Sequence, residues 1–488
     1  MNTKTGLGAA VRAVMRRAIR EYRDSPDTVA YLERHLERMD EPLRVAIAGR
    51  VKAGKSTLLN ALVGEEIAAT DAGECTRAVT WYRDAKSPKI TAHLVDAPSR
   101  DLPIQRREGA LRIDLSGTWA DRVDRVVVDW PSQHLRTMTL IDTPGLESLS
   151  TEISARTADF LSGDEEPAEA DAVIYLMRHL HSANVRFLES FYDQGIARAT
   201  PVNTIAVLSR ADEIGAGRMD ALMSARRIAR RYCADEKLRA LCQTVVPVAG
   251  LLAQAARTMR QAEFNTFVEL VASRRADVEA ALLSADRFKR YDGLQPWESE
   301  DLLNRFGMCG VRLAVTLVRQ GFDDPQRLSE ELVRRSGLGT LTEVLNAQFT
   351  ERTELLKARS ALLALDVVLS RVPRPETQSL VVEVERIIAG AHEFAELRLL
   401  SSLRLGTLKL PAESLAEAER LLGGLGAGPS TRLGLGVHAS TGEQRNAALD
   451  AVSRWRRRLE NPLSSLAMAD ASRVIIRSCE GVLADLED

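Results

Sequence analysis

The sequence has few aromatic residues and no long uninterrupted apolar run. Aromatic residues make up 5% of its 488 residues, whereas hydrophobic residues make up 45%. This composition favours leucine- and alanine-rich helix packing over a β-sandwich. No stretch approaches 18 uninterrupted apolar residues, so no segment is expected to cross a bilayer as a helix. The N-terminus also lacks the apolar core of a secretory signal peptide.

The chain also lacks a charge excess and any clustering of cysteines. Its formal net charge of −2 argues against a general nucleic-acid binder, so no nucleic-acid partner is expected. Without C-x-x-C pairs or metal-ligand spacing, the cysteines indicate reduced thiols of a cytoplasmic protein. The five are Cys75, Cys233, Cys242, Cys309 and Cys479. The length predicts two or three domains.

A phosphate-binding loop of the form G-x-x-x-x-G-K-[ST] occupies residues 49–56. An apolar run precedes it and a helix-like stretch follows it, which is the context that this motif requires. The backbone N–H groups of such a loop hold the phosphates of a nucleotide at the start of a helix. Lys55 is expected to contact the phosphates and the Ser56 hydroxyl to bind Mg²⁺. The predicted phosphate site comprises Gly49, Val51, Lys52, Ala53, Gly54, Lys55, Ser56 and Thr57.

A D-x-x-G motif, Asp142 to Gly145, ends the apolar run 138–141. At the end of a strand, this motif places a carboxylate behind Mg²⁺ and a glycine N–H beneath the γ-phosphate. We expect Asp142 to belong to the metal site and Gly145 to contact the γ-phosphate. An ordinary strand-to-turn transition is the alternative.

A base-recognition motif follows the strand-like run 204–208, where Ser209, Arg210 and Asp212 lie. GTPases have [NT]-K-x-D at this place, and its aspartate accepts two hydrogen bonds from guanine that adenine cannot donate. We therefore expect Asp212 to select GTP and Arg210 to lie over the base. The alternative is a helix N-cap at Asp212. Ala249 follows the last strand-like run and is expected in the loop that flanks the base.

A mobile threonine that closes onto Mg²⁺ and the γ-phosphate is expected between these motifs. Thr76 is the candidate, and Thr70 and Thr80 are the alternatives. Ser56, Thr76 and Asp142 together form the predicted metal site.

These motifs resemble a bacterial dynamin-like GTPase of the isoniazid-inducible, actinobacterial branch. The similarity includes K-A-G-K-S-T-L-L-N-A-L from residue 52, C-T-R-A-V-T from residue 75, D-T-P-G and S-R-A-D. It extends over nearly the whole chain, through Arg432-Leu433-Gly434-Leu435 and Arg454-Trp455-Arg456-Arg457. The resemblance implies a GTPase head on a helical neck and trunk. It also implies GTP-dependent pairing of heads, with a second copy or a sister protein, and remodelling of lipid bilayers from the inner face of the plasma membrane.

Three positions depart from the dynamin pattern. Dynamins have a Gln where this chain has Val51, and a lysine where it has Ser148. Because valine cannot orient a water molecule, slow basal hydrolysis is expected. Lys52 occupies the position at which dynamins place a serine that holds a monovalent cation. We hypothesise that the Lys52 ammonium replaces that cation during hydrolysis; a solvent-exposed lysine without a role is the alternative.

Hydrophobic periodicity divides the chain into three parts. Residues 1–41 are predicted to form an N-terminal helix that packs against C-terminal helices as a neck, with a membrane-bound amphipathic helix as the alternative. Residues 42–262 alternate between strand-like and helix-like segments, which predicts an α/β phosphate-loop GTPase head with a mainly parallel sheet. Residues 263–488 show only helical patterns and are predicted to form an all-α neck and trunk.

One segment, residues 397–411, has the composition of a bilayer contact. It mixes leucines with three cations and contains no acidic residue. The residues expected to contact an anionic membrane are Leu397, Arg398, Arg404, Leu405, Leu408 and Lys409. The alternative is a helix end packed within the trunk.

Two functions therefore compete. The first is a dynamin-like GTPase that couples switch closure to movement of its helices on a membrane. The second is a GTP-regulated scaffold that pairs with a sister protein and hydrolyses GTP poorly. A ribosome-associated GTPase is less favoured, because the chain is nearly neutral and lacks RNA-binding modules.

Overall fold

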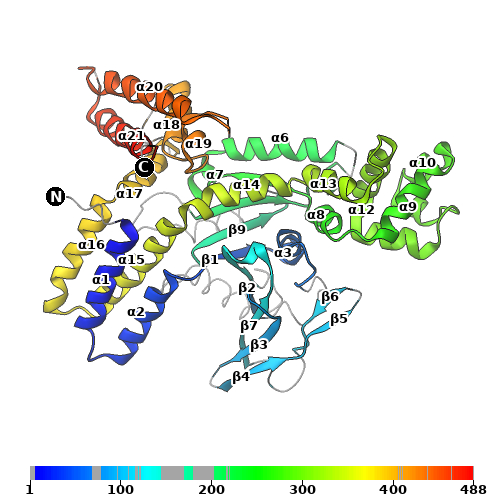
Figure 1. Cartoon of the computed structure of the whole chain (residues 1–488), viewed down its shortest axis with the longest axis horizontal. Coiled ribbons are helices and arrows are strands. Elements are labelled where there is room, and N and C mark those ends of the chain that lie inside the picture. Colours follow the sequence, from blue (N-terminus) through cyan, green and yellow to red (C-terminus); the bar gives the residue numbers. More distant parts are fainter. Residues whose placement is uncertain are drawn as a thin grey trace.

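The computed structural model describes most of the chain. The described residues are 6–68, 78–95, 97–107, 109–115, 119, 122–143, 170–179, 203–215, 218, 220–404, 406, 408, 410–436, 438–462 and 464–486. Within them an open β-sheet forms the head, and helices extend from it in two opposite directions (Figure 1).

The head is built on a nine-stranded sheet in the order β11-β10-β9-β1-β8-β2-β7-β3-β4. Neighbouring strands from β11 to β8 are parallel, as are β2 and β7, whereas the other three pairs are antiparallel. The predicted mainly parallel sheet is therefore confirmed. Its strands are β1 (Leu43–Gly49), β2 (Val79–Asp84), β3 (Lys89–Leu94), β4 (Ala97–Leu102), β7 (Val123–Trp130), β8 (Met138–Asp142), β9 (Ala172–Met177), β10 (Thr204–Ser209) and β11 (Val245–Val248). A separate hairpin joins β5 (Gln105–Arg107) to β6 (Ala110–Arg112).

Helices cover both faces of this sheet, which explains the continuous apolar runs of its central strands. In β1, Val45 and Ile47 pack with α3 (Lys55–Val63) and α14 (Leu338–Gln348) on one face. Ala46 and Ala48 alternate with them and belong to the core beneath α6 (Ala221–Ala234) and α7 (Glu236–Leu241) on the other face. The helix α8 (Gly250–Arg257) follows β11 and packs beside α3.

The N-terminal segment forms two helices rather than the single helix predicted. They are α1 (Leu7–Glu21) and α2 (Pro26–Arg38), and the break falls at Ser25, because the residue before a proline is disfavoured in helices. Both pack against α15 (Thr353–Arg371), and α1 also packs against α16 (Gln378–Gly390). These four helices are called the neck bundle here. The prediction that the N-terminal segment packs against helices from the C-terminal part of the chain is confirmed.

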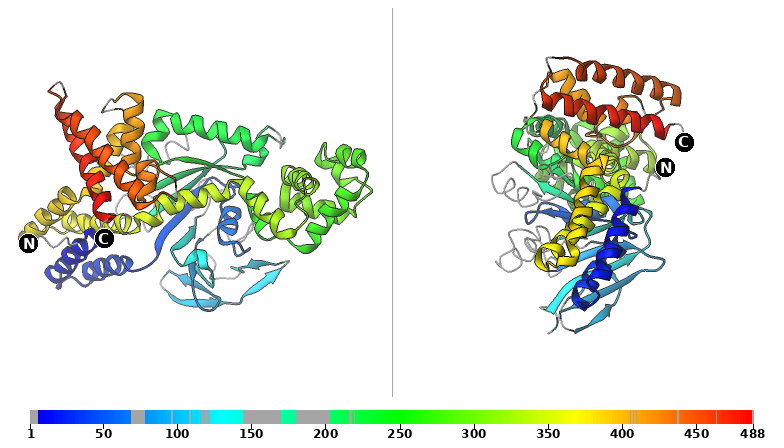
Figure 2. Two further views of the ribbon diagram at one scale, coloured as in Figure 1. Left: turned by 45° about the horizontal axis from the view of Figure 1, so that its top comes forward. Right: turned by 90° about the vertical axis from the view of Figure 1, so that its left-hand side faces the viewer.

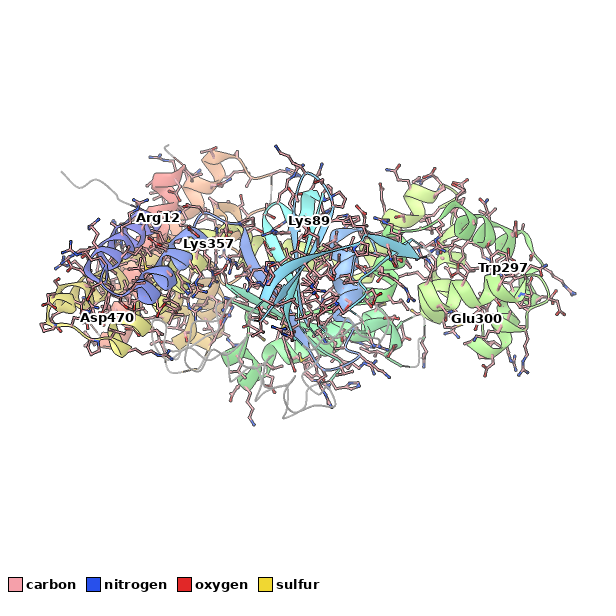
Figure 3. The ribbon with its side chains drawn as sticks, turned by 90° about the horizontal axis from the view of Figure 1, so that it is seen from below. Arg12, Lys89, Trp297, Glu300, Lys357 and Asp470 are labelled. Atoms are coloured by element: carbon pink, nitrogen blue, oxygen red, sulfur yellow. The ribbon has the colours of Figure 1, made fainter. Side chains whose placement is uncertain are left out.

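A buried aspartate joins the neck bundle to the head. Asp171, directly before β9, is 3% exposed and accepts hydrogen bonds from Arg38 Nη2 at 3.1 Å and from Ser360 Oγ at 2.9 Å. The backbone N–H of Arg44 donates to its other oxygen at 3.0 Å. Lys357 of α15, labelled in Figure 3, lies nearby and donates to the carbonyls of Met39 and Glu41.

A helical arm extends from the head on the side opposite the neck bundle (Figures 1 and 2). It comprises α9 (Gln261–Ala272), α10 (Arg275–Ala281), α11 (Ala285–Lys289), α12 (Pro296–Arg319) and α13 (Pro325–Ser336). Its core is continuous with that of the head, since Leu252 of α8, Phe267 of α9 and Phe306 of α12 belong to one cluster. Trp297, 66% exposed, lies towards the end of the arm (Figure 3).

The remaining helices form a C-terminal bundle with its own core around Trp455 and Ile475. It comprises α17 (His392–Arg404), α18 (Ala412–Leu421), α19 (Pro429–Leu433), α20 (Thr441–Leu459) and α21 (Leu466–Asp485). Three-ten turns occur at η3 (Gln133–Leu135), η4 (Ala211–Glu213), η5 (Thr350–Arg352) and η6 (Pro375–Thr377). No helix in the described part of the chain is both long and apolar enough to cross a membrane.

The helical part of the segment predicted to contact a bilayer, residues 397–404, packs against other parts of the protein. Leu397, 3% exposed, belongs to the neck-bundle core, and Leu408 packs against the C-terminal bundle. Arg404 is 9% exposed and donates to Gln243 Oε1 of the head at 3.1 Å, while Arg398 donates to the carbonyl of Ile388 at 3.5 Å. The bilayer interpretation is wrong for the buried Leu397 and Arg404, because leucines and cations at helical spacing suit a packed helix equally well, whereas Arg398 and Leu408 are half-buried. Leu405 and Lys409 lie outside the described residues.

Candidate nucleotide site

The phosphate loop joins β1 to α3 at the carboxyl edge of the parallel strands. Gly49 has φ of 148°, and a Cβ there would lie 2.6 Å from the carbonyl oxygen of Leu176 in β9. Gly54 has φ of 95° and directly precedes α3. Both positions therefore require glycine. The chain thus turns sharply out of the sheet and directs the first N–H groups of α3 towards the loop, as anion binding requires.

Lys55 lies folded over this loop. Its Nζ donates to the carbonyls of Gly49 at 3.3 Å and Arg50 at 3.4 Å. Burial lowers the pKa of Lys55, and the nearby Asp142 carboxylate opposes that shift. A phosphate group would provide stronger, charge-assisted acceptors than these two carbonyls.

Ser56 and Asp142 are brought together by strand register. β8 runs parallel to β1 with Asp142 opposite Ile47, and Ser56 Oγ donates to Asp142 Oδ2 at 2.7 Å. Asp142 Oδ1 is buried without a hydrogen-bond partner among the described residues. Burial raises the pKa of Asp142, although Lys55 and Ser56 favour its charged form. A hydroxyl beside a carboxylate with a free oxygen suits Mg²⁺, which prefers oxygen ligands and retains bound waters.

A cavity of about 120 Å³ adjoins the phosphate loop at the end of β10. Asp212 lines it and is 8% exposed, and burial raises the pKa of this carboxyl. The rest of the lining comprises Ala53, Gly54, Thr57, Leu58, Leu176, Val207, Ser209, Arg210, Glu213, Val248, Gly250 and Leu251. Ala249 is not part of this lining, although its neighbours Val248 and Gly250 are. Its backbone N–H donates to the carbonyl of Ser336.

Arg210 connects the base-recognition turn to the phosphate loop. Its backbone has φ of 52°, and its Nη2 donates to the carbonyl of Lys52 at 3.0 Å, while Nη1 donates to Glu213 at 2.6 Å. Lys52 itself has φ of 59° and is exposed. The sequence analysis missed Arg178, which directly follows β9 and donates to the same Lys52 carbonyl at 3.3 Å. A single arginine after a strand has no distinguishing pattern in the sequence.

Several predicted residues cannot be placed in this site. Thr76, Thr70, Gly145 and Ser148 lie outside the described residues. Thr80 is described and is wrong as an alternative switch residue, because it is 6% exposed within β2 and pairs with Asp142 in the sheet.

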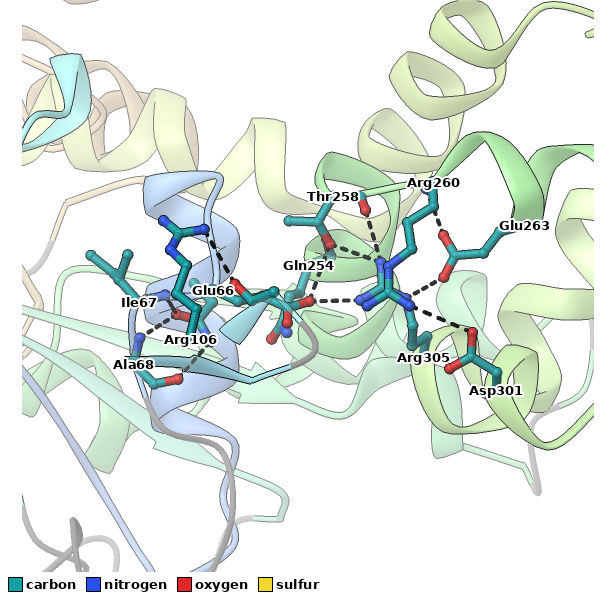
Figure 4. Close-up of polar contacts among 12 residues, drawn as sticks. Glu66, Ile67, Ala68, Arg106, Gln254, Thr258, Arg260, Glu263, Asp301 and Arg305 are labelled. Carbon is teal, nitrogen blue, oxygen red and sulfur yellow. Dashed lines mark hydrogen bonds and ion pairs between the residues drawn. The ribbon is translucent and has the colours of Figure 1, made fainter. Parts of the chain in front are cut away.

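The helix α12 of the arm borders the nucleotide site at two places that sequence reasoning did not anticipate. Gly307 interrupts α12 with φ of 66° and ψ of 167°, and a Cβ there would lie 3.7 Å from Asp212 Oδ2. Two residues earlier, Arg305 Nη1 donates to Glu66 at 2.6 Å, and Nη2 donates to the carbonyl of Thr258 at 2.9 Å (Figure 4). Arg305 also pairs with the buried Glu263. Glu66 lies shortly before the segment that contains Thr70 and Thr76.

Comparison with known proteins identifies the family. The model of the dynamin family matches residues 45–209, which contain the phosphate loop, Asp142 and Ser209. Isoniazid-induced protein IniC of Mycobacterium tuberculosis is 40% identical over 484 residues, which cover 97% of this chain and 98% of IniC. The chain belongs to the dynamin family.

Other relatives match shorter parts of this dynamin-family chain. Isoniazid-induced protein IniA of M. tuberculosis is 32% identical over 164 residues, or 32% of this chain and 24% of IniA. A bacterial dynamin-like protein of Nostoc punctiforme is 33% identical over 115 residues, or 21% of this chain and 16% of that protein. The predicted resemblance to the isoniazid-inducible branch is confirmed. As a member of this family the protein is a GTPase that binds GTP.

Proposed function

We propose that the head hydrolyses GTP with Mg²⁺ and that the neck bundle and arm convert this cycle into movement. The observation that carries the proposal is the Ser56–Asp142 hydrogen bond beside a buried oxygen of Asp142 that has no partner among the described residues. Mg²⁺, when bound, would offset phosphate charge as the bond to the γ-phosphate breaks.

The described residues would then act in three ways. Lys55 would leave the loop carbonyls and bind the phosphates. Ser56 and Asp142 would hold the metal, Asp142 through a bound water. Asp212 would accept the two guanine N–H groups inside the cavity, where an unpaired acceptor is costly. Thr76 and Gly145 remain candidates for the switch residues that respond to the γ-phosphate.

Hydrolysis is expected to be slow without a partner. Val51 is 46% exposed and has no polar atom that could orient water. The attacking water would therefore depend on main-chain groups of the switch segments. Pairing of two heads, from two copies or from this chain and a sister protein, would order these segments. A sister partner is proposed because M. tuberculosis has two proteins, IniC and IniA, that both resemble this chain.

We further propose peripheral attachment to anionic membrane at the inner face of the plasma membrane. Because residues 397–404 are packed, attachment would use another surface. The competing function, a GTP-regulated scaffold with weak hydrolysis and no fission activity, is favoured by Val51 and Ser148.

Nucleotide binding and single-turnover hydrolysis test the proposal. Purified protein should bind GTP with Mg²⁺ at least a hundredfold more tightly than ATP, and Lys55→Ala should abolish hydrolysis. Equal affinity for ATP would contradict the assignment. A second experiment distinguishes the mechanical enzyme from the scaffold. It measures GTP-driven dimerisation and GTP turnover, with and without the sister protein and with anionic liposomes. A scaffold would dimerise, but liposomes would not stimulate its turnover.

A further inference from the structure

A second cavity, of about 220 Å³, lies between the head and the C-terminal bundle. It adjoins the amino end of β11, at the edge of the sheet opposite the nucleotide site. The head contributes residues from α6, α7 and the turn before β11, and the helical region contributes α14, α17, α18 and the loop after α18. The lining comprises Tyr232, Cys233, Leu238, Arg239, Cys242, Gln243, Thr244, Val245, Val344, Gln348, Arg404, Glu419, Gly424 and Leu425. Leu425 is 65% exposed, so the cavity reaches the surface there.

Arg404 brings a buried positive charge to this cavity. It is 9% exposed, and among the described residues its guanidinium donates to two neutral oxygens, Gln243 Oε1 at 3.1 Å and the Gly424 carbonyl at 3.3 Å. The other guanidinium of the lining, Arg239, already pairs with Glu419 at 2.6 Å. The lining therefore carries two guanidiniums and one carboxylate. Glu419 is the one carboxylate of this lining and acts on both guanidiniums, so an anionic ligand would balance the remaining positive charge.

A second buried guanidinium lies behind the first. Arg352 is 7% exposed, donates to the carbonyl of Gly423, and leaves its Nη1 without a hydrogen-bond partner among the described residues. Burial lowers the pKa of Arg352 to about 10. Arg352 and Arg404 thus hold the consecutive carbonyls of Gly423 and Gly424. Glu396 and Glu351 offset part of the charge of Arg352, so an anion in the cavity would be held mainly by Arg404.

Gln348 adds an acceptor beside Arg404. It is 3% exposed, and its Nε2 donates to the same Gly424 carbonyl at 3.3 Å. Because both side chains bond one oxygen, they lie next to each other. Gln348 Oε1 is buried without a partner among the described residues. A ligand that satisfies this pair needs anionic oxygens for the guanidinium and an O–H group for the amide oxygen.

We propose that this cavity binds a small phosphate oxyanion, held by Arg404 and recognised through its P–O–H group by Gln348. Hydrogen phosphate and protonated phosphate monoesters carry both features, whereas sulfate at neutral pH has no O–H group. The bound anion would contact α7 of the head, α14, α17 and the loop after α18 together. Phosphate would therefore strengthen the attachment of the C-terminal bundle to the head.

The test uses the full chain saturated with GDP and Mg²⁺, so that the nucleotide site is already filled. Calorimetric titration with inorganic phosphate should show saturable binding, at least tenfold tighter than sulfate. Arg404→Gln should weaken phosphate binding at least tenfold. Arg335→Gln, which removes a partly exposed arginine of the arm, is the matched control and should leave binding unchanged. Glycerol 3-phosphate distinguishes a phosphate ester, such as a lipid headgroup, from free phosphate.

Gln348→Leu gives a second, independent result if Arg404→Gln fails to fold. This variant should lose the preference for phosphate over sulfate. The proposal is overturned if GDP-saturated protein shows no saturable phosphate binding, or if a folded Arg404→Gln binds phosphate as tightly as the parent does. None of these outcomes depends on GTP hydrolysis, so they do not bear on the function proposed above.

Discussion

Two buried aspartates of the nucleotide site, Asp142 and Asp212, have pKa values that depend on their surroundings. Burial raises the pKa of each carboxyl, so both are destabilised as anions until a ligand arrives. Their surroundings differ: Asp142 lies beside the Ser56 hydroxyl, whereas Asp212 lines the cavity at the end of β10. In the function proposed above, a cation would stabilise the first carboxylate and two guanine N–H groups would stabilise the second.

Asp212→Asn tests base recognition. The amide presents an N–H group to the donors of guanine, so GTP affinity should fall by roughly a hundredfold, about 2–3 kcal/mol. Xanthosine triphosphate, whose base offers an acceptor at the same position, should bind the variant more tightly than GTP does. Competition with a fluorescent nucleotide measures both. Asp212 lies within η4, whose N-cap is Arg210, so it is not the helix N-cap that the sequence offered as the alternative. An unchanged preference for GTP would show that Asp212 does not recognise the base.

Asp142→Asn tests whether the carboxyl of Asp142 makes the stability of the protein depend on pH. Because folding raises the pKa of Asp142, its contribution to stability is present below its ordinary pKa of about 4 and is lost as pH rises through the raised value. Without nucleotide and Mg²⁺, the stability of the parent relative to Asp142→Asn should therefore decrease from pH 4 to pH 8. Mg²⁺ with GDP should reverse this trend, because the cation favours the carboxylate. Thermal unfolding across pH measures the difference; a constant difference would contradict the assignment.

Lys52→Ala tests the charge proposed to replace a monovalent cation. If the Lys52 ammonium offsets charge on the phosphates, parent turnover should be similar in K⁺, Na⁺ and choline buffers. The variant should lose at least tenfold in turnover and regain activity in K⁺. Strong K⁺ dependence of the parent, or an unimpaired variant, would show that Lys52 is a solvent-exposed residue without this role.

At the scale of elements, α12 connects the arm to both halves of the nucleotide site. Gly307 adjoins Asp212, and Arg305 holds Glu66, which precedes the predicted switch segment. Arg305 is 12% exposed and Glu263 is 4% exposed, so the network that they form is buried and worth more than a surface ion pair. Bound nucleotide and arm position should therefore be coupled through this helix.

Gly307→Ala tests this contact. The backbone angles of Gly307 are reserved for glycine, so alanine should destabilise the protein by about 1–3 kcal/mol. The displaced helix should also weaken GTP binding several-fold through Asp212. Gly339→Ala is the control, because Gly339 is helical in α14 with no atom within 4 Å of an added Cβ, and it should be neutral. Denaturant unfolding measures the stability of the two variants, and GTP titration measures their affinity. If both variants changed stability and affinity equally, the coupling of α12 to the nucleotide site would be contradicted.

At the scale of the whole molecule, the hydrogen bonds of Asp171 connect the neck bundle to the sheet of the head. This carboxylate joins α2, α15 and the start of β1 beneath the head, and each of its bonds is buried or partly buried. Movement of the neck bundle relative to the head must break or rotate these bonds. The nucleotide cycle proposed above would have to supply the energy for that movement.

Asp171→Ala should lower the free energy of unfolding by roughly 3–5 kcal/mol, because Arg38 stays buried without its anion. Asp470→Asn removes an exposed partner of Arg473 in α21 and should change stability by about 0.5 kcal/mol or less. Urea denaturation compares the two. Similar, small losses would show that Asp171 does not hold the neck bundle in place.

Local motifs allowed the head to be predicted well. The phosphate loop, the D-x-x-G motif and the turn at Asp212 each depend on residues adjacent in sequence, and parallel strands bring their carboxyl ends to one edge. Arg178, Arg305 and Gly307 could not be found this way. Each acts through a contact with a distant segment, and a single arginine or glycine has no local signature.

Sequence motifs were sufficient to predict that the chain binds a triphosphate at the end of a parallel sheet, because glycine spacing and apolar runs encode that turn locally. The location of residues 397–404 could not be predicted in this way and followed from tertiary packing. Leucines and arginines at helical spacing are equally stable against lipid or against protein. Burial against the head and the neighbouring helices, which depends on the packing of segments more than a hundred residues apart, placed them inside.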